Sequence, residues 1–186
     1  MSILDAKATK SLEGGPSFTF RNRVIRSIWN IVWLTLASWT PPPFRLFRIT
    51  LLRLFGADVA WSANVYSSAQ IWFPPNLIMR EYSCLGRGVN CYCMALITLE
   101  KYAIISQGAH LCTGTHDIED PDFQLYAKPI HIGAKAWIAA EAFIGPGVTV
   151  HDGAVVGARA VLFKDADPNG VYVGNPAILI RNRSRK

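Results

Sequence analysis

A six-residue repeat runs from Phe55 to Asp167 and constrains the fold of this 186-residue chain more than any other feature. Sixteen hexapeptides fit this stretch; the first position is apolar in fifteen of them, and the fifth is small or aliphatic in fourteen. Only Ile97–Thr98 and the fifteen residues Asp117–His131 interrupt the rhythm. A helix repeats about every 3.6 residues and a half-buried strand every two, so neither explains a period of six.

A period of six indicates a coiled β-sheet in which each hexapeptide is one short strand followed by a bend. Three hexapeptides close one triangular turn, and the residues at positions one and five point inward. Turns stacked at about 4.8 Å pair their strands in parallel and join the apolar residues into one core. We therefore predict a parallel β-helix over residues 55–180, with an excursion loop at 117–131 and a basic tail at 181–186.

The region before the repeat has a different composition. Residues 1–54 hold eight of the 19 Lys and Arg but only two of the 13 acidic residues, so they account for the whole net charge of +6. Residues 1–19 are predicted to form a flexible arm, and residues 20–54 to form two helices separated by Pro41–Pro43, because proline ends a helix. A neutral body argues against a nucleic-acid-binding protein, which would present a basic face.

The two helices of residues 20–54 have two alternative roles. An open end of a β-helix exposes apolar side chains and unpaired strand groups, and the helices can cap it. Alternatively, their apolar, Arg-flanked face can make peripheral contact with an anionic membrane. The longest apolar stretch, Ser27–Trp39, is too short to span a bilayer and contains Asn30 and Ser38.

The four cysteines form no CxxC pair; they are Cys84, Cys91, Cys93 and Cys112. This spacing indicates reduced thiols and predicts a cytoplasmic protein, with the inner face of the cell membrane as the alternative location. No residues are spaced as a tetrahedral zinc site requires, so we expect no metal.

Three motifs carry a resemblance to a known family: the single loop after "THD", the stretch "IGAKAWIAAEAFIGPGVTVHDGAVVGARAVLFKD", and the terminal "VGNPA". With them, residues 20–183 resemble the hexapeptide-repeat acetyltransferases, in the branch of the galactoside, maltose and nodulation-factor O-acetyltransferases. "LLRLFGADV" and "SQGAHLCTGTHD" are most similar to the colanic acid biosynthesis acetyltransferases. The resemblance implies a left-handed β-helix and a homotrimer with its sites between adjacent prisms. It also implies direct transfer from acetyl-CoA to a sugar hydroxyl in exopolysaccharide biosynthesis.

Transfer of an acetyl group from a thioester to a hydroxyl needs a base that removes the hydroxyl proton. An imidazole suits this role because it titrates near neutral pH, and His116 ends the last hexapeptide before the loop. Spacing alone leaves a solvent-exposed corner histidine as an equal alternative, but the family's catalytic histidine falls on this position. The resemblance also places the oxyanion donor at the backbone N–H of Ala140.

The resemblance assigns further residues to the two substrates. Those for coenzyme A form a slot of small residues and a set of cations for its phosphates: Ala140, Gly157, Ala158, Lys164, Arg181 and Arg183. The candidates for contact with the sugar acceptor are Asn90, Tyr92, Trp137 and Asp117. The cations can equally be surface charges, and Trp137 can equally pack at a trimer contact. For Asp117 the simpler interpretation is a solvated loop residue.

Two other functions stay open at this point. An enzyme of the same fold can acetylate an antibiotic or another small molecule, and profiling of acceptors separates that reading from sugar acetylation. A non-catalytic trimeric scaffold would fail to bind coenzyme A.

Overall fold

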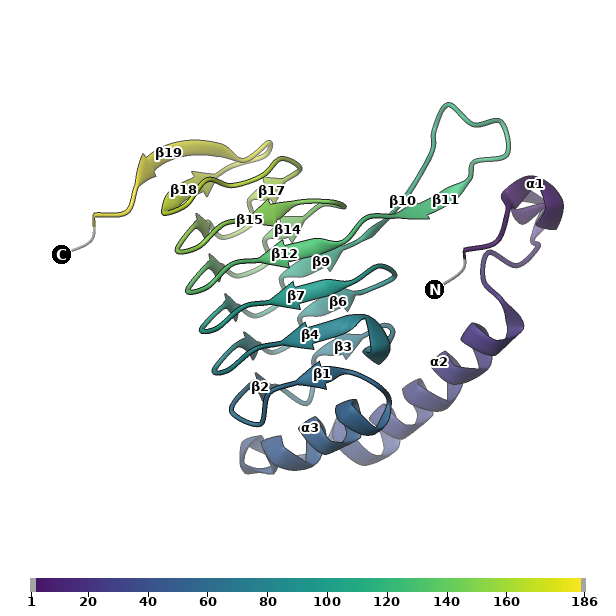
Figure 1. The fold of residues 1–186 in the computed structure, drawn as a ribbon, viewed down its shortest axis with the longest axis horizontal. Helices are drawn as coiled ribbons and strands as arrows, with labels where there is room; N and C mark the ends of the chain where they lie inside the picture. Colours follow the sequence, from purple (N-terminus) through teal and green to yellow (C-terminus); the bar gives the residue numbers. More distant parts are fainter. Residues whose placement is uncertain (1–2, 185–186) are drawn as a thin grey trace.

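The computed structural model of the protein describes residues 3–184 and shows a triangular solenoid with helices at one end (Figure 1). The helical elements are α1 (Ala6–Thr9), η1 (Ser11–Glu13), α2 (Phe20–Val32), the π-helical turn η2 (Trp33–Ala37), η3 (Pro42–Phe44), α3 (Arg45–Leu54) and η4 (Pro74–Asn76). Apart from η4, they all precede the first strand of the solenoid.

The solenoid has three faces, each a parallel sheet. The first face contains β1 (Asp58–Val59), β4 (Leu77–Met79), β7 (Ile97–Leu99), β12 (Ile130–Ile132) and β15 (Thr149–Val150). The second contains β2 (Asn64–Val65), β5 (Cys84–Leu85), β8 (Ile104–Ile105), β13 (Trp137–Ile138), β16 (Val155–Val156) and β18 (Gly170–Val173), with β19 (Ile178–Asn182) added antiparallel. The third contains β3 (Gln70–Ile71), β6 (Asn90–Tyr92), β9 (His110–Cys112), β14 (Phe143–Ile144) and β17 (Val161–Leu162). The prediction of a parallel β-helix is confirmed.

The strand register gives the length of each turn. On the third face Gln70 pairs with Asn90, Asn90 with His110, His110 with Phe143, and Phe143 with Val161. The first two of these turns therefore take 20 residues each, the next takes 33 because a hairpin is inserted, and the last takes 18.

The predicted phase of the repeat is right from Met79 onward and wrong before it. In the first turn the third-position residues Ala63 and Ala69, predicted to face outward, are 0% and 1% exposed, whereas Trp61, predicted to face inward, is 52% exposed. The cause is the turn that contains η4, which has 20 residues, two more than three hexapeptides. The next turn also has 20 residues, and its two extra residues are Ile97–Thr98.

The apolar core runs the length of the solenoid and continues into the helices. One fully buried column comes from the first face: Val59, Met79, Leu99, Ile132 and Val150. Trp29 and Trp33 of the α2–η2 segment and Ile49 and Leu52 of α3 belong to the same core. The inner faces of the helices thus cover the first turn, and their outer faces remain exposed. No helix within residues 3–184 is long and apolar enough to cross a membrane.

Candidate active site

The long interruption of the repeat contains a β-hairpin that leaves the edge between the third and first faces (Figure 1). Its strands β10 (Gly114–His116) and β11 (Leu125–Ala127) pair antiparallel. Gly114 lies where the chain leaves the coil below: a Cβ there would overlap Sδ of Met94 and lie 3.1 Å from Cε1 of Tyr92. A larger residue at this position would push the hairpin away from the solenoid.

The predicted base, His116, is the last residue of β10 and is half-buried. Its Nδ1 lies 2.8 Å from the carbonyl oxygen of Phe123, and its ring stacks on the Phe123 ring with centroids 4.3 Å apart. A carbonyl oxygen can only accept a hydrogen bond, so Nδ1 carries a proton, and in the neutral ring the lone pair is therefore on Nε2. The hairpin therefore holds His116 in the tautomer that a general base requires.

The N-terminal arm supports this hairpin. Residues 3–19, for which a flexible arm was predicted, contain α1 and η1, and α1 lies beside the hairpin (Figure 1). The N–H of Ala6 donates to Oε1 of Gln124 at 2.7 Å, and Nε2 of Gln124 donates to the carbonyl oxygens of Leu4 and Leu125 at 3.2 and 2.6 Å. Gln124 follows Phe123, so the arm is bonded to the residue adjacent to the carbonyl that orients His116.

The predicted oxyanion donor, Ala140, lies at the edge between the second and third faces. The flanking amides of this corner are used by the coil: the N–H of Ala139 donates to Val156 O at 2.8 Å and that of Glu141 to Gln107 O at 3.0 Å. Within the part of the chain that the structure describes, the N–H of Ala140 makes no hydrogen bond. It is therefore free to donate to a bound group, as the oxyanion hypothesis requires.

Gly157 and Ala158 form the corner one turn above Ala140. Gly157 is predicted to be small to admit a ligand, but the structure gives a different reason: a Cβ there would lie 2.8 Å from Cγ1 of Val173 and 3.2 Å from the carbonyl oxygen of Tyr172. The glycine is needed for the close packing of the last strand. Ala158 is exposed and leaves the edge above Ala140 unobstructed.

The three cations predicted for phosphate binding do not converge in one chain. Lys164 is exposed at the edge between the third and first faces. Arg183 donates from Nη1 to the carbonyl oxygen of Gly153 at 2.9 Å, which ties it to the edge between the first and second faces. Arg181 is exposed on β19. None of them lies on the edge that carries Ala140.

The four acceptor candidates lie in three different places. Asn90 and Tyr92 point outward from β6 on the third face, and burial raises the pKa of Tyr92, which keeps its hydroxyl protonated. Trp137 lies on the second face, 47% exposed, and its Nε1 donates to Oγ of Ser106 at 2.8 Å. Asp117 caps the hairpin tip by accepting from the N–H of Glu119 at 3.1 Å. The structure thus brings only Asn90 and Tyr92 together.

Two further sets of reactive side chains, the cysteine of β6 with its neighbour Cys93 and the histidine of β9, are buried or partly buried by packing within the solenoid. Cys91 and Cys93 are fully buried, and Cys93 Sγ donates to the carbonyl oxygen of Phe73 at 3.3 Å, so neither faces a substrate. His110 lies between Asn90 and Phe143 on the third face, and burial lowers its pKa, which favours the neutral ring. Residues 3–184 contain no group of three or more side chains arranged to hold a metal ion.

Two residues that shape this site were not found from the sequence. Phe123 orients His116 through its carbonyl and its ring, and Gln124 links the hairpin to the arm. An antiparallel pairing of the two ends of the interruption could have indicated them. Pairing Gly114 with Ala127 places His116 opposite Leu125, and therefore close to residues 123 and 124.

Comparisons with known proteins agree with this architecture. A model of the bacterial transferase hexapeptide (six repeats) matches residues 129–164. A protein of Escherichia coli named as a colanic acid biosynthesis acetyltransferase, WcaF, is 41% identical over 162 residues, which cover 87% of this chain and 89% of that protein. The crystal structure of a maltose O-acetyltransferase from Clostridium difficile 630 superposes with a TM-score of 0.80 at 24% identity, covering 90% of both chains. A galactoside acetyltransferase in complex with coenzyme A superposes with a TM-score of 0.74 at 21% identity, covering 98% of this chain and 91% of that one.

Proposed function

Because the chain belongs to the hexapeptide-repeat acetyltransferases, we propose that it transfers acetyl from acetyl-CoA to a sugar hydroxyl in exopolysaccharide biosynthesis. The observation that carries the proposal is His116, whose Nδ1 is held by the Phe123 carbonyl so that Nε2 can act as a base. The name of WcaF supports the exopolysaccharide role, and the solved complex of a similar fold with coenzyme A supports the donor.

Each proposed step of the transfer uses a group of this chain. Nε2 of His116 takes the proton of the acceptor hydroxyl as its oxygen attacks the thioester carbonyl. The N–H of Ala140 donates to the oxygen that becomes negative in the tetrahedral intermediate. When the C–S bond breaks, the imidazolium of His116 gives its proton to the departing sulfur. The acetyl group passes directly to the sugar, and the histidine returns to its starting form.

His116 and Ala140 lie on two different edges of the prism, so one chain does not assemble this constellation. We therefore propose a homotrimer in which His116 of one subunit faces Ala140 of the next, as a closed ring of identical contacts allows. The outward surface of the second face supports such a contact, because Ile104 and Trp137 are apolar and each is 47% exposed. In this arrangement Lys164 and Arg181 reach coenzyme A from neighbouring edges, while Ala140 and Ala158 line its slot.

A proline at position 140 tests the oxyanion donor. Proline removes the N–H of this residue, and the coil accepts proline at the equivalent corner position, Pro146. We expect Ala140→Pro to lower kcat about 10²–10³-fold while the protein stays folded. The measurement is coenzyme A release, with circular dichroism as the folding check. Lys101→Pro changes the same corner position on another edge and serves as the control. Equal kcat for Ala140→Pro and Lys101→Pro would remove Ala140 from the mechanism.

The alternative functions are separated by two measurements. Turnover with an antibiotic or another small molecule, and none with sugars, would favour the small-molecule acetyltransferase. Absence of coenzyme A binding in calorimetry would favour the non-catalytic scaffold.

We also propose that the outer surface of α2 and α3 contacts an anionic membrane. Large apolar side chains that are more than half exposed lie on these helices and on the segment between them: Phe20, Ile31, Leu34, Trp39 and Leu54. Arg21, Arg23 and Arg53 are exposed on the same helices and supply charge complementarity to anionic lipid.

Vesicle sedimentation tests the membrane contact. Because the inner faces of the helices are part of the core, deletion of residues 1–54 would disturb the fold, and point variants are needed. We expect Ile31→Glu combined with Leu54→Glu to abolish binding to anionic vesicles, because charged groups are expensive to insert among lipid chains. Ile178→Glu, at the opposite end of the solenoid, is the control. Equal sedimentation of both variants and the wild type would exclude this surface.

A further inference from the structure

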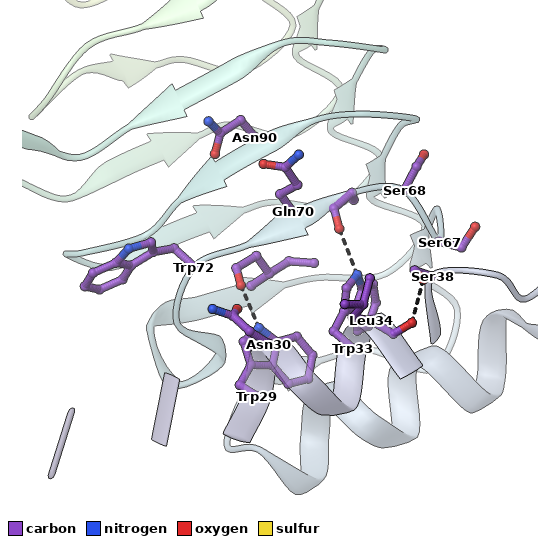
Figure 2. A pocket seen from close by; sticks show the side chains of 12 residues that line it. Trp29, Asn30, Trp33, Leu34, Ser38, Ser67, Ser68, Gln70, Trp72 and Asn90 are labelled. Carbon is purple, nitrogen blue, oxygen red and sulfur yellow. Dashed lines mark hydrogen bonds between the residues drawn. The ribbon is translucent and has the colours of Figure 1, made fainter. Parts of the chain in front are cut away.

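A groove of about 460 Å³ lies between the α2–η2 segment and the outward surface of the third face (Figure 2). Three carboxamide side chains point into it from successive layers: Asn30 of α2, Gln70 of β3 and Asn90 of β6. Gln70 and Asn90 are register partners on adjacent strands, so their side chains follow each other at the strand spacing of about 4.8 Å.

The walls of the groove are fixed, but its amides are free. The indole N–H of Trp29 donates to Ile71 O at 2.6 Å, and that of Trp33 donates to Ala69 O at 3.0 Å, which locks both rings (Figure 2). In contrast, the carboxamides of Asn30, Gln70 and Asn90 make no hydrogen bonds within residues 3–184. Three amides with unused donors and acceptors on a rigid wall are suited to a ligand with many hydroxyls.

The groove leads toward the catalytic hairpin along a row of aromatic rings. Trp72 forms its rim, and its ring meets that of Tyr92 edge to face with centroids 5.4 Å apart. Tyr92 in turn touches the base of the hairpin, since a Cβ on Gly114 would lie 3.1 Å from its Cε1. The same outward surface therefore connects the amides to the strand that carries His116.

The chemistry of the lining selects among ligands. Within the described residues the lining contains no charged side chain; its polar members are amides and the hydroxyls of Ser38, Ser67 and Ser68. The guanidinium of Arg26 lies at the rim, 4.2 Å over the centroid of the Trp72 ring, and it is not part of the lining, so the wall that carries the amides favours a neutral ligand. Amides and hydroxyls pair with sugar hydroxyls.

We propose that this groove binds a second, neutral sugar unit of the acceptor, so that the enzyme acts on an oligosaccharide rather than on a single sugar. This inference rests on the proposed function for the unit that reacts at His116. The unit in the groove lies beyond it, one to two strand layers closer to the helices, and its binding energy positions the reacting hydroxyl.

The test compares acceptors of increasing length: glucose, galactose, and their neutral di- to tetrasaccharides. We expect KM, measured by coenzyme A release, to be lower for the longer acceptors. Gln70→Ala and Asn30→Ala should each raise the tetrasaccharide KM about 3- to 10-fold, the size of a neutral hydrogen bond, and leave the monosaccharide KM and kcat unchanged. Asn64→Ala, an outward amide on the second face in the same turn, should change neither.

Calorimetry with the tetrasaccharides and no acetyl-CoA separates this inference from the proposed function. Binding that weakens in Gln70→Ala, without acetyl transfer, would uphold the groove and contradict the acetyltransferase assignment for these sugars. Transfer with the same KM for all lengths, or oligosaccharide binding that Gln70→Ala leaves intact, would overturn the groove and leave the assignment standing. No binding and no transfer with any of these sugars would contradict both.

Discussion

Replacing His116 with alanine is expected to lower kcat for acetyl transfer about 10²–10⁴-fold, the usual contribution of a positioned general base. The physical reason is the loss of Nε2, the lone pair that the Phe123 carbonyl keeps available by holding the proton on Nδ1. The half-buried imidazole supports no core packing, so stability should change little. Coenzyme A release with a sugar acceptor measures the effect, and calorimetry should show unchanged acetyl-CoA binding.

Two variants serve as controls for His116→Ala. His151→Ala removes an exposed histidine of the first-to-second edge and should leave kcat unchanged. Phe123→Leu keeps the backbone carbonyl but removes the ring that stacks on His116, so it should cost less than the loss of the imidazole. Undiminished turnover by His116→Ala would refute the assignment of the base.

The second large effect is on stability and concerns the junction between the helices and the solenoid. Arg48 of α3 is 1% exposed, and its guanidinium donates to Val65 O at 2.7 Å, Thr40 Oγ1 at 2.8 Å, Pro41 O at 3.0 Å and Pro42 O at 3.1 Å. These bonds satisfy the carbonyl groups of Pro41 and Pro42 at the start of η3 and that of Val65 in the first turn of the solenoid. Arg48 therefore joins the helical segment to the solenoid. Burial lowers the pKa of Arg48, yet the four bonds hold the charged form.

We expect Arg48→Leu to lower the free energy of unfolding by at least about 3 kcal/mol, because buried carbonyls left without a donor cost about 1–3 kcal/mol each. Urea unfolding followed by tryptophan fluorescence measures this change. Arg48→Lys keeps the charge but cannot reach all four acceptors, so its loss should be intermediate. Arg45→Leu removes a guanidinium that donates to Trp61 O and Ala63 O near the surface, and it should cost about 1 kcal/mol. An Arg48→Leu loss as small as that of Arg45→Leu would contradict the role of the junction.

The repeat made the solenoid predictable, because one inward residue every six positions permits few other folds. The same reasoning failed in the first turn. There the hexapeptide "FPPNLI" has an apolar residue at its first position, but this residue does not take the inward position that the repeat predicts. Phe73 occupies that first position, but Pro74–Asn76 forms a 3-10 turn and Phe73 is only partly buried. Local turn geometry, which periodicity does not contain, set the register there.

The candidate site was only partly predictable. His116 stood out because it ends the regular repeat, and Ala140 came from the family pattern. That the carbonyl of Phe123 orients His116 depends on backbone pairing across a hairpin, which leaves no signature in side-chain identity. The reason for Gly157 is likewise its contact with Val173, a residue sixteen positions later in the chain.

A mixing experiment tests the central claim, that His116 of one subunit works with Ala140 of its neighbour. His116→Ala and Ala140→Pro subunits, each nearly inactive alone, are coexpressed and the mixed trimers purified. If neighbouring subunits build each site, every mixed trimer contains one interface in three with both groups intact, so the mixed trimers restore about one third of wild-type coenzyme A release. Activity no greater than that of the two variants measured separately would contradict the shared site.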